Sequence, residues 1–174
     1  FVFAGWFSDG DLISIIEKTV VRIRVCSEVT LSPDNYEFIY KFNYGTGIVI
    51  HTEGYILTAD HVLQSKNCNS SQSIWVQNPK SNEWISPQII KRNEKLDLAL
   101  LQVGEQFEDI IEFSETRLLT GDKAWVAGFP DNPQLQDKNI VLSLGNINNP
   151  SFNFKEKENN PDNRKLIQIS NYVI

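Results

Sequence analysis

A period-two alternation of apolar and polar residues runs through most of this chain, and it restricts the fold to one built mainly from β-strands. The segment "VVRIRV" (20–25) is a half-buried strand of this kind. Residues 36–59 are the most β-rich, and further strands are predicted at 73–78, 83–92 and 96–103. Together these give about six short strands with polar turns between them, enough to close a small antiparallel barrel. We therefore expect an all-β fold.

A second, shorter set of strands follows Gly121-Asp122. "KAWVAGF", "NIVLSLGNI" and "KLIQISNYVI" are three candidate strands, and they amount to half of another barrel. Between the last two lies the polar stretch 148–164, which contains two prolines and is predicted to be a long loop, mobile over 151–164. One short amphipathic helix is expected at 8–19, with Ser8 or Asp9 as its N-cap. The Glu53-Gly54 pair is predicted to form a tight hairpin turn, with the glycine at positive φ.

These patterns give a three-part organisation. The N-terminal segment and helix occupy 1–19, the first β-barrel occupies 20–110, and the first half of a second barrel occupies 111–174. Composition supports one soluble globular domain or two small barrels, because 41% of the 174 residues are hydrophobic and 22% are charged. The net charge is −6 and no long Lys/Arg cluster is present, so nucleic acid is not expected as a partner. No apolar run has the length of a membrane-spanning helix.

The start of the chain and its two cysteines leave alternatives open. No methionine occurs, even at position 1, which indicates a cut or processed chain. The apolar start "FVFAGWF" is the stub of a removed anchor, an artificial boundary, or a strand that packs on the domain. Cys26 and Cys68 form one bridge or remain free thiols, and a single pair does not identify the compartment.

The chain has only two histidines, and they differ in context. His51 lies within a hairpin just before a turn, where a surface residue is expected. His61 lies where a predicted strand ends and a helical turn begins, a turn that Thr58 or Asp60 could cap. A histidine at such a corner is either packed in the core or presents its ring as a general base. Position alone does not decide between these readings.

Asp97 favours the second reading of His61. It is the only charged residue in the apolar run "LDLALLQV", where strand alternation places it on the same face as Ala99 and Leu101. A carboxylate buried there is costly unless it is paired, whereas an outward-facing one would need an open face. Accepting a hydrogen bond from the imidazole of His61 would offset that cost and fix the tautomer of a base.

Three motifs in order make a family resemblance specific. "YGTGIVIHTEGYILTADHVL", "LDLALLQV" and "GDKAWVAGFP" resemble the trypsin-fold serine proteases of the HtrA (Deg) family, from about Leu12 to the last residue. The resemblance implies a double β-barrel, with the second barrel incomplete in this chain. It also implies that His61 is the general base and Asp97 the residue that orients it.

The chain departs from this family pattern at the nucleophile. In the family, a strand like "KLIQIS" leads into a G-N-S-G-G loop that carries the serine, and this chain ends at Ile174, where that loop would begin. Ser143, Ser151 and Ser170 are ordinary strand or loop serines, and neither cysteine takes the place of the nucleophile. The histidines and cysteines have no metal-ligand spacing, so no metal or other cofactor is expected.

The expected function is therefore serine endopeptidase, acting on polypeptide substrates, with the nucleophile beyond the chain end and the 174 residues alone inactive. By resemblance, Tyr172, Val173 and Ile174 contribute one wall of the substrate pocket, oligomers are possible, and the cell envelope or a secreted location is favoured. One rival is a catalytically inactive protease-fold binding module. The other is a lone barrel in which His61 and Asp97 lie far apart.

Overall fold

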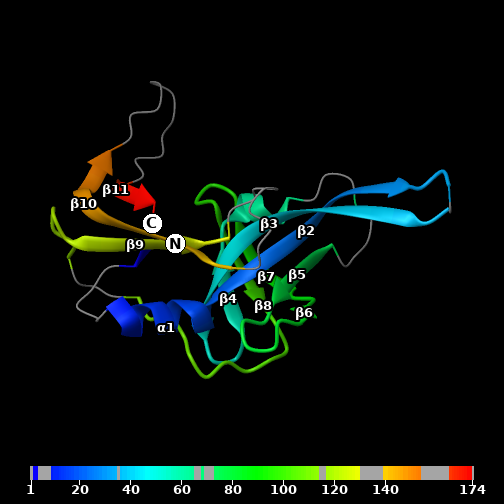
Figure 1. The fold of residues 1–174 in the computed structure, drawn as a ribbon, viewed down its shortest axis with the longest axis horizontal. Coiled ribbons are helices and arrows are strands. Elements are labelled where there is room, and N and C mark those ends of the chain that lie inside the picture. The colour runs from blue at the N-terminus through cyan, green and yellow to red at the C-terminus, as the bar shows by residue number, and fades with distance from the viewer. Residues whose placement is uncertain are drawn as a thin grey trace. The chain divides into compact units, whose positions relative to one another are not determined.

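The structure is a computed structural model that describes residues 2–3, 9–34, 36–64, 68, 73–113, 117–129, 139–153 and 165–173. For 2–3, 9, 151–153 and 165–173 it describes the backbone alone. The chain forms two compact units (Figure 1). The larger unit contains 9–112 and 128–141, and the smaller unit contains 1–8, 113–127 and 142–174.

The larger unit contains one α-helix, one 3-10 helix and seven strands among the described residues. Its helices and strands are α1 (Asp9–Thr19), β2 (Val20–Leu31), β3 (Phe38–His51), β4 (Tyr55–Thr58), η1 (Asp60–Leu63), β5 (Ile74–Gln77), β6 (Trp84–Ile85), β7 (Gln88–Asn93) and β8 (Leu98–Gln102). The predicted helix at 8–19 and the predominance of strands are confirmed. Gly54 lies in the β3–β4 turn at φ 79°, as predicted, and a side chain there would meet the carbonyl oxygen of Val103.

All seven strands of the larger unit belong to one antiparallel sheet in the order β6-β5-β2-β3-β4-β8-β7. Its first and last strands, β6 and β7, are consecutive in the chain and separated only by Ser86 and Pro87. The chain therefore connects the two ends of the sheet, which curls accordingly. The prediction of one strand over 83–92 was wrong in this detail, because Pro87 has no N–H to donate to a ladder and divides the segment into two strands.

Apolar side chains from the inner face of this sheet form the core of the larger unit. The alternation in β2 is confirmed, with Val21, Ile23 and Val25 buried. The intervening arginines lie against aromatic rings, Arg22 over Tyr44 and Arg24 over the rings of Phe42, Trp75 and Trp84. The other buried members of the core are Val49, Ile56, Leu63, Val76, Ala99, Leu101, Val103 and Phe107.

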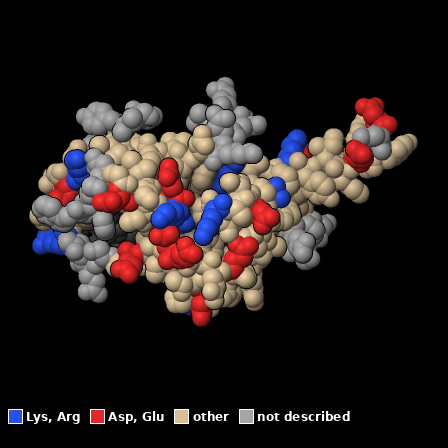
Figure 2. Space-filling view, turned by 60° about the horizontal axis from the view of Figure 1, so that its bottom comes forward, with Lys and Arg blue, Asp and Glu red and all other residues tan. Residues whose placement is uncertain are grey.

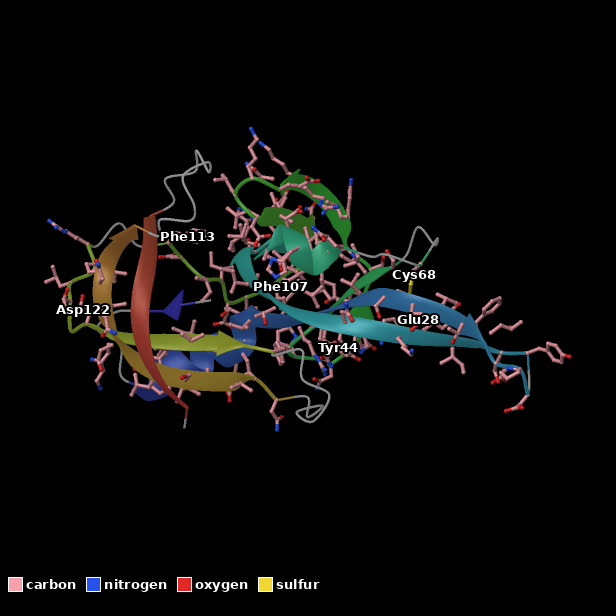
Figure 3. The ribbon with its side chains drawn as sticks, turned by 90° about the horizontal axis from the view of Figure 1, so that it is seen from above. Glu28, Tyr44, Cys68, Phe107, Phe113 and Asp122 are labelled. Atoms are coloured by element: carbon pink, nitrogen blue, oxygen red, sulfur yellow. A yellow bond between two sulfur atoms is a disulfide. The ribbon has the colours of Figure 1, made fainter. Side chains whose placement is uncertain are left out.

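The hairpin of β2 and β3 extends beyond the strands that flank it (Figure 1). On one side, β5 pairs only with Ile23 to Val25, and on the other β4 pairs only with the Gly47–His51 end of β3. Near the base of this extension a disulfide joins Cys26 to Cys68, with 6.0 Å between the two Cα atoms (Figure 3). The bridged alternative for the two cysteines is therefore the one found.

The smaller unit is a four-stranded sheet in the order β1-β9-β10-β11. Its strands are β1 (Val2–Phe3), β9 (Lys123–Gly128), β10 (Val141–Asn153) and β11 (Lys165–Val173). Strand β1 pairs with β9, so Val2 and Phe3 of the apolar start form a strand in this structure. The three strands predicted after Gly121-Asp122 are all present.

The predicted loop over 148–164 was partly wrong. Residues 148–153 continue β10, where Phe152 faces Leu166 and Asn153 faces Lys165 of β11. Two register shifts, on either side of Asn149, allow the strand to pass Pro150. Residues 154–164 lie outside the described part of the chain, and the predicted mobility of 151–164 stays untested. The predicted boundaries at 19, 110 and 111 likewise stay predictions.

Acidic and basic side chains are interspersed on the face shown in Figure 2. Within the described residues, no helix has the length and hydropathy required to cross a membrane.

Candidate active site

His61 lies on a short corner between β4 and η1. Strand β4 buries Ile56 and Thr58, and η1 buries Leu63, so the corner is anchored on both sides of the histidine. Ala59 joins the two elements in an extended conformation. The His61 side chain is left 67% exposed, which excludes the packed-core reading of this residue.

Two small residues at the start of "GTGIVI" allow this corner to approach β3. A Cβ atom on Gly45 would overlap the side chain of Val62, which directly follows His61. On Gly47, a Cβ atom would come within 2.7 Å of Ile56 Cγ2. The glycines of this motif therefore leave room for the strand and helix that carry the histidine.

Thr46, between these two glycines, connects the corner to the segment after β9. Its carbonyl oxygen accepts a hydrogen bond from Thr58 Oγ1 at 2.8 Å. Its hydroxyl oxygen accepts one from the backbone N–H of Phe129, also at 2.8 Å. Parts of the first and third sequence motifs thus meet at one threonine.

Asp97 comes from the turn between β7 and β8. Its backbone has φ 52°, and its N–H donates to the carbonyl of Glu94 at 3.2 Å. Aspartate tolerates this left-handed conformation better than most residues, because its short side chain bonds locally. Placing Asp97 within a strand was therefore wrong: β8 begins at Leu98, with Ala99 and Leu101 buried.

The Asp97 carboxylate contacts His61 at two points. Oδ2 lies 2.7 Å from the imidazole Nδ1, and Oδ1 accepts the His61 backbone N–H at 2.9 Å. The predicted contact between Nδ1 and Asp97 is confirmed, and the reading in which the two side chains lie far apart is wrong. The Asp97 side chain is 39% exposed, so it is not buried among the apolar side chains of the core.

The expected helix cap is absent from η1. Its N-cap is Ala59, which makes no side-chain cap bond, and the Thr58 hydroxyl is directed to Thr46. The Asp60 carboxylate instead forms a paired contact with Arg92 of β7, Oδ1 to Nε at 2.6 Å and Oδ2 to Nη2 at 2.9 Å. Sequence reasoning missed Arg92. The sequence feature that could have indicated a cationic partner was Asp60, an acidic residue between the apolar end of β4 and Leu63, where a buried carboxylate requires pairing.

The ion pair sets the protonation of Asp60, whose side chain is 2% exposed. The hydrogen bond from Arg92 is the main cause that lowers the pKa of the Asp60 carboxyl, and burial opposes it. The same hydrogen bond raises the pKa of Arg92. Both partners therefore stay charged.

The other predicted residues lie as follows. His51 ends β3 at the surface, as expected, with its Nδ1 accepting the Glu53 N–H at 3.2 Å. Tyr172 and Val173 lie in β11 opposite Leu144 and Ser143. Their side chains and Ile174 lie outside the described residues, so their predicted role in substrate binding is untested.

The candidate nucleophiles and metal ligands can also be placed. Ser143 and Ser151 lie in β10, and Ser170 lies in β11. Cys26 and Cys68 are bonded to each other. Within the described ranges, no group of three or more His, Cys, Asp or Glu side chains is arranged to hold a metal ion.

Comparisons with known proteins agree with this architecture. The chain is 41% identical over 100 residues to the magnetosome formation protease MamE of Paramagnetospirillum magneticum (strain ATCC 700264 / AMB-1), a match covering 58% of this chain and 12% of that protein. It is similar in fold to the Rv3671c protease of M. tuberculosis in its active form, with a TM-score of 0.62 and 19% identity, over 91% of this chain and 60% of that one. It thus spans less than two thirds of either protein.

A family model supplies the assignment. The trypsin-like peptidase domain matches residues 45–173, which include the "GTG" motif, His61, Asp97 and strands β9, β10 and β11 of the smaller unit. The predicted trypsin-like fold is confirmed. The chain belongs to the trypsin-like peptidase domain family, as its HtrA-like motifs predicted.

Proposed function

We propose that this chain carries the general base and the orienting carboxylate of a serine endopeptidase. The observation that supports this most directly is the two-point contact of Asp97 with His61, at 2.7 Å to Nδ1 and 2.9 Å to the backbone N–H. Membership of the trypsin-like peptidase family and the similarity to two proteases support peptide-bond hydrolysis as the reaction.

In the proposed reaction, Asp97 Oδ2 accepts a hydrogen bond from the Nδ1–H of His61, and this tautomer leaves Nε2 with a free lone pair. Nε2 takes the proton of the nucleophilic serine as its oxygen attacks the substrate carbonyl, and later donates it to the leaving amine. The Asp97 charge stabilises the imidazolium between these two steps. The exposure of the His61 ring is compatible with direct access by a substrate.

We further propose that the serine comes from outside these 174 residues, because none of their serines has the G-x-S-G context. On this proposal the chain alone does not hydrolyse peptides. Without a nucleophile no acyl-enzyme forms, and loss of the serine costs on the order of a millionfold in kcat in a comparable hydrolase.

The test compares the 174-residue chain with the full-length gene product, using casein as an unfolded substrate and a serine-directed fluorophosphonate as a label. The full-length protein should cleave and label, and the short chain should do neither. In the full-length protein His61→Ala should abolish turnover. Asp97→Asn should lower kcat by about ten-thousandfold, the effect expected when the wrong imidazole tautomer is stabilised.

His51→Ala is the matched control, because it removes the other histidine from an exposed strand end. It should leave turnover unchanged. If His51→Ala and His61→Ala are equally active, the proposed base is wrong. If the full-length protein neither cleaves nor labels, the inactive binding module is the better description.

A further inference from the structure

Asp60 and His61 are neighbours on η1, yet their side chains have opposite surroundings. The Asp60 carboxylate is almost completely buried, whereas the His61 ring is exposed. Both oxygens of Asp60 are bound by one guanidinium, from Arg92. Asp60 therefore pairs with Arg92 and not with the neighbouring imidazole of His61.

The register of three strands explains how Arg92 reaches this position. Arg92 of β7 lies opposite Ala99 of β8, and Ala99 lies opposite Thr58 of β4. Directly opposed residues project from the same face of a sheet, so the Arg92 side chain starts above the short side chain of Ala99. Asp60 lies two residues after Thr58, at the start of η1. A guanidinium can therefore span from β7 across β8 to η1.

The hairpin of β7 and β8 consequently contacts η1 at two adjacent residues. Arg92, at the end of β7, contacts Asp60, and Asp97, at the end of the following turn, contacts His61. A bidentate guanidinium–carboxylate contact fixes orientation as well as distance. The first contact thus limits the rotation of η1 relative to the turn that carries Asp97.

We propose that the Asp60–Arg92 ion pair is a positioning element of the candidate active site. It holds His61 against Asp97, and Arg92 neutralises the charge of a second carboxylate next to the imidazole. Arg92 and Asp60 are positioning residues that act through His61, and the inference rests on the proposed function of the His61–Asp97 pair.

The charges of these four residues act on one another. The Asp97 charge raises the pKa of the Asp60 carboxyl, and the His61 charge lowers it, although both effects are smaller than that of Arg92. Without Arg92, two carboxylates would stabilise the imidazolium form of His61. With Arg92 present, the guanidinium charge offsets the effect of Asp60 on the imidazolium.

Further charged groups lie on the described segments that contact this corner. Glu94, in the same turn as Asp97, raises the pKa of Arg92, and Lys95 lies beside it in that turn. Strand β8, which packs on η1, contributes no charged side chain. Strand β2 also contacts η1, and its arginines Arg22 and Arg24 lie against aromatic rings.

The test is an NMR titration of the imidazole signals in the 174-residue chain, which does not require catalytic activity. Its two histidines are assigned with His51→Ala, and His51 then serves as the internal control. Asp60→Asn leaves the Arg92 charge uncompensated and should lower the midpoint of the His61 titration. Arg92→Gln should raise it. Each change should be about half a pH unit or more, about a threefold change in proton affinity.

Two further variants separate charge from geometry. The double variant Asp60→Asn with Arg92→Gln removes both charges and should return the midpoint close to that of the wild type. Arg92→Lys keeps the charge but loses the two-pronged contact. It should leave the midpoint unchanged, and in the full-length enzyme it should lower kcat with little effect on KM.

Asp60→Asn is the decisive variant, because a guanidinium does not lose its proton at accessible pH and asparagine has nearly the same shape as aspartate. If the His61 midpoint is unchanged in Asp60→Asn, or if His51 moves equally, the proposal is wrong. If these midpoints move as expected but His61→Ala leaves turnover intact, the proposed function fails and the electrostatic coupling stands. If His61→Ala abolishes turnover while the midpoints stay fixed, only the positioning proposal fails.

Discussion

Reducing the Cys26–Cys68 bridge should destabilise the larger unit by several kcal/mol. The two cysteines are 42 residues apart in the sequence, so the bridge closes a long loop in the unfolded chain. The loop-closure relation gives an entropy loss of about 13 cal/mol/K for a loop of this length, or about 4 kcal/mol at 25 °C. Small domains have a free energy of unfolding of about 5–15 kcal/mol, so this is a large fraction of the total.

The loop enclosed by this bridge contains most of the hairpin of β2 and β3, strand β4 and the His61 corner. Reduction should therefore affect the candidate site as well as global stability. Urea unfolding followed by tryptophan fluorescence measures the effect, since Trp75 and Trp84 lie in the larger unit. The oxidised chain, the chain in reductant and the double variant Cys26→Ser with Cys68→Ser should be compared at equal temperature and pH.

The reduced chain and the double serine variant should lose similar amounts of stability, and reductant should have no effect on the variant. Measured losses are often smaller than the loop-closure value, because unfolded chains retain some structure. A loss of less than about 1 kcal/mol for both would contradict the entropic argument. It would mean that the unfolded chain already keeps the two segments close together.

Two substitutions at the His61 corner, with one control substitution in α1, test its packing and its charge. Gly45→Ala should destabilise the chain by about 1–3 kcal/mol, because the new methyl group overlaps Val62. Gly10→Ala, in α1 with nothing within 4 Å, should instead stabilise it by about 0.5–1 kcal/mol in the same urea titration. The pKa of Asp60 is lowered in the folded chain, so its pairing contributes stability above the unfolded pKa of about 3.9, and this contribution is lost as pH falls through the folded value. In Asp60→Asn, the free energy of unfolding should therefore fall less steeply as the pH is lowered below about 4. An unchanged pH dependence would contradict a stabilising contribution from the Asp60–Arg92 pair.

The parts of the fold that could be predicted from the sequence depend on local alternation and local turns. Strand β2 was visible because Val21 and Ile23 alternate with arginines, and the β3–β4 turn because Gly54 is at its apex. The division of 83–92 into β6 and β7 was missed because the alternation of side chains continues on both sides of Pro87. It gives no information on where the hydrogen-bond ladder is interrupted. The extension of β10 through Pro150 was missed for a related reason, since register shifts compensate for residues that usually end a strand.

For the candidate site, the residues could be predicted more reliably than their surroundings. His61 and Asp97 were identified from motifs, and their contact is observed. Asp97 was nevertheless assigned to a strand, because it directly precedes the alternating residues of β8. Its left-handed backbone belongs to the turn, and a pattern of apolar and polar residues does not reveal it. Arg92 was not identified at all. Its contact with Asp60 depends on the alignment of β4, β8 and β7, which only the folded sheet supplies.

The two carboxylates that flank His61 differ in exposure, and this difference separates their expected roles. Asp97 is 39% exposed and binds an exposed imidazole, so the imidazole is accessible for the proton exchange proposed above. Asp60 is 2% exposed and both of its oxygens are occupied by a guanidinium that remains charged at neutral pH. The second pair therefore has no proton to transfer at neutral pH. In the proposed mechanism, one four-residue helix thus carries both Asp60, held in a fixed ion pair, and the base His61, which transfers the proton while Asp97 orients it.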